Sequence, residues 1–303
     1  MDPLQKYGRL KVCGDRLTGE KGETVRLFGM STHGLAWQPK YVCRECFEAL
    51  RDEMGCECIR LALYTHQYKG YCTDGDKEEL YALVKKGIDL AIELGIYVIA
   101  DWHILMEESP LTYADEAERF FASLSAEYPG CPNLIYEICN EPNGVATWED
   151  IKAYAERIIP VIRANSPEAV VAVGTPEWAQ RCELALADPL DFDNVIYTLH
   201  FYAATHGKFL RDRAEKCLEA GLPIFVTECS ITEATGDGAP DMESAAKWAE
   251  LLDLYQVGMI GWSLSAGFDQ SSVFKQGCEK LSGWSDEDLK PTGKWFREIF
   301  RHK

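Results

Sequence analysis

The sequence lacks two features that mark proteins of membranes and nucleic acids: a long apolar run and a cluster of basic residues. No apolar run approaches the roughly 20 residues that a bilayer-spanning helix needs. Only 31 Lys and Arg stand against 49 Asp and Glu, and the net charge is −18. Nucleic acids and anionic membrane surfaces attract clustered Lys and Arg, so we expect neither as a partner. A neutral ligand such as a sugar polymer is compatible with this charge.

Also missing are a glycine-rich phosphate-binding turn after any apolar run, a linker, a low-complexity tract and a block of like charge. The first absence disfavours the doubly wound open sheet that binds nucleotides. The others favour one domain over residues 1–303. The opening residues, MDPLQKYGRL, lack the apolar core of a secretion signal. From the residues alone two interpretations stand: the protein is cytoplasmic, or a leader segment, with or without other modules, is left off.

Cysteine, by contrast, is abundant, with 12 residues in the chain. Most lie within apolar runs, for example Cys58, Cys139, Cys217 and Cys229. A thiol in such a run behaves as a small buried hydrophobe, and a chain of this length needs no disulfide framework, so we expect mostly reduced thiols.

One group resembles a metal site: Cys43, Cys46, Cys56 and Cys58. A helix over 43–55 would separate two of its members by about 15 Å, too far for one zinc ion. We expect no metal.

Apolar, β-branched runs recur along the whole chain and alternate with amphipathic stretches. Eight runs predict strands, at residues 25–31, 58–64, 97–103, 134–141, 170–175, 195–202, 223–229 and 258–264. They are almost continuously hydrophobic, as in a parallel sheet that is covered on both faces. Helices are predicted over 77–95, closed by Gly95, over 147–167 with Thr147 as N-cap and a kink at Pro160, and over 291–300.

Strict alternation of strand and helix, eight times over, predicts a closed (β/α)8 barrel of the TIM type. Residues 25–303 would form the barrel. Residues 1–24 would be an N-terminal extension whose hairpin, near GDRLTGEKGE, closes the bottom.

The active site of such a barrel lies at the carboxyl ends of its strands. Polar and aromatic side chains gather there: His33, Trp37, Arg60, Tyr64, Trp102, His103, Asn140, Glu141, Trp178, His200, Tyr202, His206, Glu228 and Trp262. Taken one at a time, a histidine or tryptophan such as His33, His206 or Trp178 is more often structural than functional. Together they carry a desolvation cost that a purely structural rim would avoid. The combination therefore indicates a functional site.

Glu141 and Glu228 each end an apolar strand, and strands four and seven face each other across the barrel mouth. Paired carboxylates beside a cleft are the equipment for glycosidic bond cleavage, in which one donates a proton and the other attacks the anomeric carbon. Arg60 and Tyr202 could keep Glu228 charged. Glu137 shares strand parity with Glu141 and should also point inward. Whether Arg60, water or a proton balances its charge is left open by the sequence.

Several motifs now carry a resemblance to a known family. NEPNG (140–144), TEC (227–229), DWH (101–103) and HFYAATHG (200–207) resemble motifs of glycoside hydrolase family 5. STHGLAW (31–37), IYEICNEPNG (135–144) and GWSLS (261–265) are most similar to its bacterial endoglucanase branch. The resemblance runs from about residue 8 to the end of the chain and preserves the order of the motifs.

The resemblance implies a retaining endo-β-1,4-glucanase that cleaves cellulose by double displacement. Glu141 matches the family's acid/base and Glu228 its nucleophile. Six residues match those that surround this pair: Arg60, His103, Asn140, His200, Tyr202 and Trp262. Further substrate contacts are expected from His33, Trp37, Tyr64, Trp178 and His206. The resemblance implies no cofactor, a polysaccharide as the partner, and secretion, and we expect a monomer.

The sequence departs from the family pattern at two places. Cys229 follows the nucleophile where an aromatic residue is frequent. The loop after strand eight, SAGFDQSS (265–272), has no lysine, although the branch usually places a lysine and an acid there against the sugar. These changes affect the expected affinity and product pattern on the non-reducing side of the cut.

Three alternatives remain open. The same chemistry could act on mannan, xylan or xyloglucan, because the choice depends on the shapes of loops. A catalytically dead barrel that only binds carbohydrate is disfavoured by the intact Glu141 and Glu228. A metal-dependent hydrolase using His33, His103 and His200 is disfavoured because the usual HxH-like spacing is absent.

Overall fold

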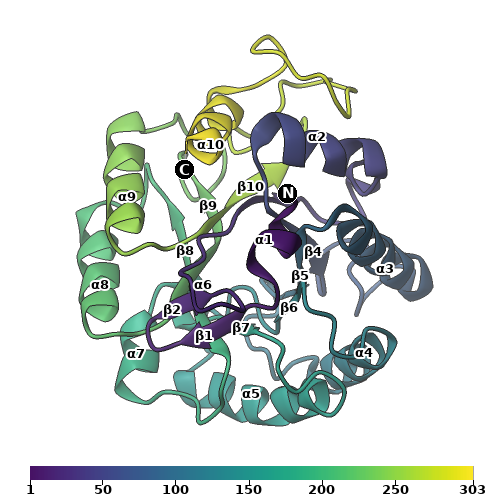
Figure 1. Cartoon of the computed structure of the whole chain (residues 1–303), viewed down its shortest axis with the longest axis vertical. Helices are drawn as coiled ribbons and strands as arrows, with labels where there is room; N and C mark the ends of the chain where they lie inside the picture. The colour runs from purple at the N-terminus through teal and green to yellow at the C-terminus, as the bar shows by residue number, and fades with distance from the viewer. Residues whose placement is uncertain (303) are drawn as a thin grey trace.

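Eight parallel strands close into a barrel within residues 1–302, the part of the chain that the computed structural model describes (Figure 1). In order around the barrel they are β3 (Phe28–Thr32), β4 (Cys58–Tyr64), β5 (Tyr97–His103), β6 (Leu134–Glu137), β7 (Val171–Val173), β8 (Val195–Tyr202), β9 (Ile224–Ser230) and β10 (Met259–Leu264). β10 pairs in parallel with β3 and closes the ring. The predicted TIM barrel is confirmed.

The strand that leads to Glu141 is shorter than the sequence predicts. A strand was expected over 134–141, but β6 ends at Glu137. Beyond it the backbone still follows the end of β5, because the amide of Asn140 donates to the carbonyl of Trp102 at 3.2 Å and that of Glu141 to Ile104 at 3.3 Å. Glu141 therefore lies in an irregular segment, while Glu228 lies within β9.

Helices surround the barrel and cover its outer face (Figure 1). They are α2 (Arg44–Met54), α3 (Lys77–Leu94), α4 (Ala114–Glu127), α5 (Trp148–Arg163), α6 (Pro176–Ala179), α7 (Cys182–Ala187), α8 (Lys208–Glu219), α9 (Met242–Leu254) and α10 (Pro291–Arg301), with a 3-10 turn at Pro39–Tyr41. α3 ends at a left-handed Gly95, as predicted. α5 continues past Pro160 but ends at Arg163, before the predicted limit of 167.

The N-terminal segment covers the bottom of the barrel. After α1 (Pro3–Tyr7), the antiparallel strands β1 (Lys11–Cys13) and β2 (Arg16–Thr18) form a hairpin that lies in front of the barrel in Figure 1. Its turn falls at residues 14–15, with Gly14 at φ 62°, so the hairpin begins earlier than expected. Leu10, Leu17 and Val25 pack against the apolar side chains at the starts of the barrel strands. This contact closes the bottom, as predicted.

The interior of the barrel changes character from bottom to top, as strand β4 illustrates. Cys58 belongs to the apolar cluster at the bottom, and Ala62 and Tyr64 belong to a second apolar cluster at the top. Arg60 lies between them and is fully buried. Residues of β4 that alternate with these, such as Leu61, pack outward against the helices. A polar layer is thus enclosed between two apolar ones.

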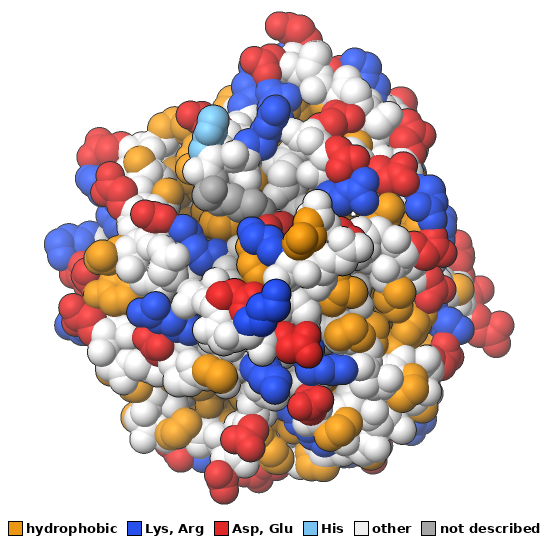
Figure 2. All heavy atoms as spheres, in the orientation of Figure 1, with side chains coloured by type: hydrophobic (Ala, Val, Ile, Leu, Met, Phe, Trp, Pro, Cys, Tyr) orange, Lys and Arg blue, Asp and Glu red, His pale blue; other side chains and the backbone are white. Residues whose placement is uncertain are grey.

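The surface agrees with the composition. On the face shown in Figure 2, acidic and basic side chains are interspersed among scattered hydrophobic ones. Among residues 1–302, no helix has both the length and the apolar content that a membrane span requires.

All twelve cysteines occur as thiols, and the Sγ atoms of Cys182 and Cys217 lie 3.3 Å apart between α7 and α8.

The N-terminus of α5 provides a stability test. The hydroxyl of Thr147 accepts from the amide of Asp150 at 3.2 Å, and the Asp150 carboxylate accepts from the amide of Thr147 at 3.0 Å. We expect Thr147→Ala to lower the free energy of unfolding by about 1 kcal/mol, because it removes the hydroxyl that accepts from the Asp150 amide and donates to the Asp150 carboxylate at 3.0 Å, while the bond from the Thr147 amide remains. Urea unfolding followed by circular dichroism measures this change. Thr147→Ser keeps the hydroxyl and should be nearly neutral, and equal losses in both variants would contradict the capping explanation.

Candidate active site

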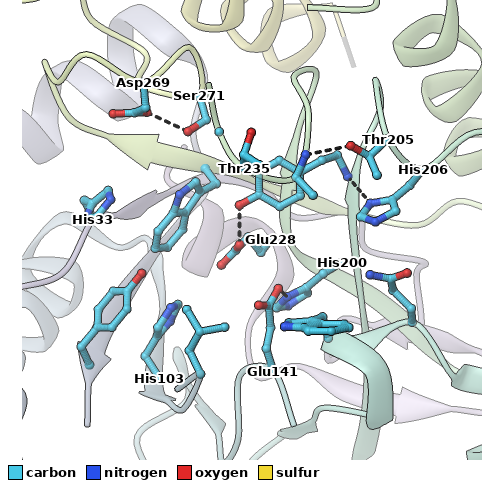
Figure 3. A pocket seen from close by; sticks show the side chains of 18 of the residues that line it. His33, His103, Glu141, His200, Thr205, His206, Glu228, Thr235, Asp269 and Ser271 are labelled. Atoms are coloured by element: carbon cyan, nitrogen blue, oxygen red, sulfur yellow. Dashed lines mark hydrogen bonds and ion pairs between the residues drawn. The ribbon is translucent and has the colours of Figure 1, made fainter. Parts of the chain in front are cut away.

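A cavity of about 750 Å³ opens at the carboxyl ends of the barrel strands (Figure 3). Ten of the residues singled out by the sequence line it: His33, Tyr64, His103, Glu141, Trp178, His200, Tyr202, His206, Glu228 and Trp262. Arg60 and Asn140 lie beneath the cavity and are fully buried. Trp37 packs on Tyr64, with ring centroids 4.5 Å apart. Trp102 packs away from the cavity, against the Phe120 ring of α4. The structure therefore gathers the predicted residues at one end of the barrel, with Trp102 as the exception.

The guanidinium of Arg60 connects the polar groups beneath this cavity. Its Nε donates to Glu137 Oε2 at 2.7 Å, and its Nη1 donates to Glu228 Oε2 at 3.1 Å. Its Nη2 reaches Asn140 Oδ1 at 2.6 Å and Asp101 Oδ2 at 3.0 Å. Burial lowers the pKa of Arg60, but the carboxylates around it raise the pKa more, and the net shift is upward. Arg60 is therefore a permanent cation in this layer.

Arg60 balances the charge of Glu137, a point that the sequence left open. Both carboxylate oxygens of Glu137 accept from Arg60, at 2.7 and 3.2 Å. Burial alone would raise the pKa of Glu137, but Arg60 and His200 lower it to about 2. The buried glutamate is therefore ionised and needs no proton to balance it.

The two carboxylates of the cavity have different hydrogen-bond partners. Glu228 accepts from the Tyr202 hydroxyl at 2.7 Å in addition to Arg60. Burial and the neighbouring Glu228 raise the pKa of Tyr202 well above its usual value, so this phenol stays a donor. Glu141 instead has its Oε1 2.9 Å from His200 Nδ1. Glu141 and His200 lie side by side in Figure 3. The environment thus distinguishes the two glutamates.

The carboxylates of Glu141 and Glu228 are close together. Within residues 1–302, Glu141, His200 and Glu228 are the only group of potential metal ligands found, and their donor atoms lie within 4.8 Å of one another. Glu228 already accepts from Arg60 and Tyr202, and the two ring nitrogens of His200 lie 2.9 Å from Glu141 Oε1 and 2.9 Å from the Thr227 hydroxyl. Contacts at hydrogen-bond distance are the geometry that general acid–base catalysis requires. That the enzyme needs no metal remains a prediction.

Asn140 and His103 are oriented by the same arginine. Because Asn140 Oδ1 accepts from Arg60, its amide nitrogen points toward Ile104 O at 3.0 Å and His103 Nε2 at 3.3 Å. That nitrogen is a donor, so His103 Nε2 is the acceptor, and the ring carries its hydrogen on Nδ1, 2.6 Å from Asp101. Burial, followed by the charge of Arg60, lowers the pKa of His103 to about 3. His103 is therefore neutral.

Aromatic rings form a platform on one side of the glutamates. Trp262 stacks on His103, with centroids 5.3 Å apart and planes 14° apart, and it lies 5.1 Å from the His33 ring. His33 Nδ1 accepts from the amide of Gly34 at 2.8 Å, and burial lowers the pKa of His33. Trp37 is fixed because its ring nitrogen donates to the carbonyl of Tyr68 at 2.8 Å. These flat faces match the apolar faces of sugar rings.

The opposite side carries a second set of apolar surfaces. His206 lies beyond Glu228 from His33 in Figure 3, and its Nδ1 accepts from the amide of Tyr202 at 2.8 Å. Trp178 remains 46% exposed above the cavity. The sequence did not single out Gln180, Phe209 or Thr235, which also line the cavity. They lie in loops and a helix start beyond the strand ends, and only the closeness of Phe209 to the HFYAATHG motif could have pointed to it.

The two departures from the family pattern differ in what they bring to the cavity: Cys229 does not line it, whereas the loop after β10 contributes Asp269 and Ser271 to its lining. Cys229 packs outward in the layer between the strands and helices, where its Sγ donates to Ile260 O at 3.4 Å. In the loop after β10, Asp269 accepts from Ser271 Oγ at 2.8 Å and from Ser272 Oγ at 2.7 Å. Lys290, just before α10, donates to the loop carbonyl of Gly267 at 2.9 Å. The lysine near this loop thus supports its backbone and lies outside the set of residues that line the cavity.

Comparison with known proteins agrees with this geometry. Residues 18–267 match the model of the family described as Cellulase (glycosyl hydrolase family 5). The chain belongs to glycosyl hydrolase family 5. It is a glycoside hydrolase, and its resemblance to the family is confirmed.

Family 5 relatives align along nearly the whole chain. Endoglucanase A of Butyrivibrio fibrisolvens is 41% identical over 295 residues, which cover 96% of this chain and 68% of the relative. An endoglucanase of Clostridium saccharobutylicum is 40% identical over 287 residues, covering 94% and 63%. The chain thus spans about two thirds of the length of these relatives.

Two solved structures of family 5 are also similar. Cellulase Cel5C_n has a TM-score of 0.95 and 38% identity, with 99% of this chain and 94% of that chain covered. The catalytic domain of Thermobifida fusca endoglucanase Cel5A, solved in complex with cellotetraose, has a TM-score of 0.94 and 35% identity, with 99% and 100% covered.

His206 gives this family 5 chain a specific pH dependence of stability. Burial, with a smaller effect of His200, lowers the pKa of His206 to about 4 from 6.5. The neutral ring therefore stabilises the fold fully above pH 6.5, and this contribution is lost as the pH falls toward 4, because only the unfolded chain takes up the proton. Urea unfolding at stepped pH should show a smaller fall in stability for His206→Gln, by up to about 1.4 kcal/mol per pH unit. The exposed His302 provides the control. His302→Gln should keep the wild-type slope, and a wild-type slope in His206→Gln would refute the assignment.

Proposed function

We propose that this chain is a retaining endo-β-1,4-glucanase that hydrolyses internal bonds of cellulose and related β-glucans by double displacement. The supporting observation is the distance between the carboxylates, because an oxygen of Glu141 and one of Glu228 lie within 4.8 Å. Retaining glycosidases hold their two carboxyl groups about 5 to 5.5 Å apart, whereas inverting ones leave about 6.5 to 9.5 Å for a water molecule.

In the first step, Glu228 attacks the anomeric carbon and forms a glycosyl ester, while Glu141 gives its proton to the departing oxygen. Tyr202 and Arg60 hold the two oxygens of Glu228, at 2.7 and 3.1 Å, and so fix the direction of attack. In the second step, Glu141, now a carboxylate, takes a proton from water, which attacks the same carbon and releases Glu228. Two inversions restore the β configuration.

Binding surfaces on both sides of the catalytic pair support cleavage within a chain. His33 and His206 lie on opposite sides of Glu228 in Figure 3. His33 adjoins Trp37, with centroids 5.4 Å apart, and His206 adjoins Phe209, with centroids 6.3 Å apart. Sugar units could therefore rest on aromatic rings before and after the bond that is cut. The relatives' names, endoglucanase, agree with this proposal.

The choice of polysaccharide is the open part of the proposal. Mannan, xylan and xyloglucan differ from cellulose in hydroxyl orientation or substitution, which loop side chains such as Gln180 and Thr235 could sense. The catalytic domain should release reducing sugar fastest from soluble β-1,4-glucan. A panel of these four polysaccharides tests this expectation, and faster release from mannan would assign another substrate to the same chemistry.

The proposal extends to the setting in which the enzyme works. We infer that residues 1–303 form a single catalytic domain, with residues 1–24 as an extension, and that the enzyme is secreted and monomeric. An insoluble, extracellular polymer can be reached only by a secreted enzyme, and a cavity built from one barrel needs no second subunit. Sedimentation of the purified chain checks the monomer, and cell fractionation of the natural host checks secretion.

The stereochemistry of hydrolysis tests the roles of the two glutamates. We expect proton NMR to show the β anomer as the first product, before mutarotation. Glu141→Ala should still be glycosylated by 2,4-dinitrophenyl cellobioside, whose leaving group needs no proton, but should turn over slowly. Glu228→Ala should be inactive on this substrate unless azide fills the gap and gives the α-glycosyl azide. Initial release of the α anomer, or equal residual activity of the two variants, would contradict the roles given to Glu141 and Glu228.

Trp262 tests the aromatic platform. Trp262→Ala should lower kcat/KM on cellotetraose about tenfold or more, because the sugar next to the cut would lose the ring face that Trp262 offers. Trp262→Phe keeps an aromatic face and should retain more activity. Near-ultraviolet circular dichroism checks that both variants are folded. Wild-type kinetics in folded Trp262→Ala would show that the ring serves packing alone.

A further inference from the structure

A third glutamate lies beneath the catalytic pair and has no role in the two steps described above. Glu137 is fully buried at the end of β6. Its Oε2 accepts from Arg60 Nε at 2.7 Å, and its Oε1 accepts from the Thr227 hydroxyl, also at 2.7 Å. With a pKa of about 2, Glu137 carries no proton of its own and can only accept hydrogen bonds.

This contact fixes the direction of the next hydrogen bond. The hydroxyl of Thr227 has one hydrogen, and Glu137 takes it. The same oxygen lies 2.9 Å from His200 Nε2, so Thr227 must be the acceptor in that pair and His200 the donor. His200 therefore carries a hydrogen on Nε2 whether its ring is neutral or charged.

The state of Nδ1, on the other side of the ring, then decides where Glu141 carries its proton. Nδ1 lies 2.9 Å from Glu141 Oε1. A neutral ring would present a lone pair there and would draw the acid proton onto Oε1. A protonated ring donates to Oε1 instead and leaves the acid proton on Oε2, which His200 does not engage. Only the second arrangement offers the proton to a substrate.

The surroundings of His200 favour the protonated ring. Burial lowers the pKa of His200, but Glu137, Glu141 and Glu228 raise it to about 9 when all three are ionised, and Glu137 and Glu228 still raise it when Glu141 carries its proton. Titratable groups face the ring from several elements: Glu137 and Glu141 from β6 and the segment after it, Glu228 from β9, Asp101 and His103 from β5, and His206 from the loop after β8. Arg60 on β4 acts through Glu137.

We propose that Glu137, acting through Thr227, is a positioning residue that holds the His200 hydrogen on Nε2 and keeps this ring protonated, so that Glu141 carries its acid proton on Oε2. The proposal rests on the assignment of Glu141 as acid/base under Proposed function. When the first bond breaks, the Oε2 proton leaves with the alcohol, and Glu141 becomes a carboxylate paired with the His200 cation. Water returns a proton to Oε2 in the second step, and His200 keeps both of its protons throughout.

The charges around His200 are consistent with a ring that stays protonated through both steps. Forming the ester removes the negative charge of Glu228, and loss of the acid proton creates one on Glu141. Both carboxylates lie within 4.8 Å of His200. The number of negative charges beside the ring is therefore the same in the free enzyme and in the intermediate, and nothing in the cycle favours its deprotonation.

Thr227→Val tests the proposal, because valine keeps the shape of threonine but offers no hydroxyl. We expect kcat/KM on cellotetraose, whose leaving group needs the acid proton, to fall about tenfold or more. On 2,4-dinitrophenyl cellobioside the fall should be under about threefold, since that leaving group departs without a proton. The alkaline limit of activity on cellotetraose should also move to lower pH, because the ring loses its proton more easily. Thr227→Ser keeps a hydroxyl and should show wild-type kcat/KM on both substrates and the wild-type pH profile.

A direct measurement separates this proposal from a purely structural role. Nitrogen-15 NMR of the His200 side chain in the wild type should show hydrogen on Nε2 and a charged ring at pH 7, with deprotonation at lower pH in Thr227→Val. A neutral His200 at pH 7 in the wild type, equal losses of Thr227→Val on the two substrates, or a Thr227→Ser variant as impaired as Thr227→Val would each overturn the proposal. If the wild type failed to retain configuration, the proposed function would fail, whereas the NMR titration would still report on Glu137 and Thr227.

Discussion

The buried positive charge of Arg60 is the constraint around which the centre of this barrel is built. Moving a guanidinium out of water costs several kcal/mol, and the cost is offset only when every donor finds an acceptor. The acceptors are Ser31, Asp101, Glu137, Asn140 and Glu228. They come from β3, β5, β6, the segment after β6, and β9. Arg60 is therefore satisfied only when the barrel is closed, which couples formation of the site to completion of the fold.

The apolar layers above and below Arg60 strengthen the effect of its charge on the pKa values of neighbouring groups. Leu10, just before the hairpin, and Leu17 within it help to seal the bottom, and Tyr64 and Trp262 lie over the top. In such a medium charges act on one another more strongly than in water. The consequence is a set of acidities far from ordinary values, with a pKa of about 2 for Glu137 and about 9 for His200. One fold can thus hold an ionised carboxylate and a protonated imidazole side by side at neutral pH.

The sequence predicts the barrel because its strands are buried on both faces and therefore read as continuous apolar runs. Strands β4, β5 and β8 have the predicted bounds, and the two glutamates that we propose as catalytic were found where such runs end. Loop geometry could not be predicted in the same way. Lys290 supports a loop more than twenty residues earlier in the chain, and Phe209 reaches the cavity from the first turn of α8. Such placements depend on contacts between distant segments, which hydrophobic periodicity does not encode.

The ending of β6 at Glu137 gives the two carboxylates that we propose as catalytic different backbone support. Glu228 lies within β9, whose backbone is held by β8 on one side and β10 on the other. Glu141 lies four residues past the end of its strand, and its amide makes a hydrogen bond of 3.3 Å to the carbonyl of Ile104. Local opening should therefore expose the Glu141 amide to hydrogen exchange sooner than that of Glu228. A nucleophile must approach one carbon along one line, whereas an acid/base serves a departing alcohol and then an arriving water. With the roles we propose, the barrel supports the nucleophile on both sides and the acid/base by a single backbone hydrogen bond to Ile104, directly after β5.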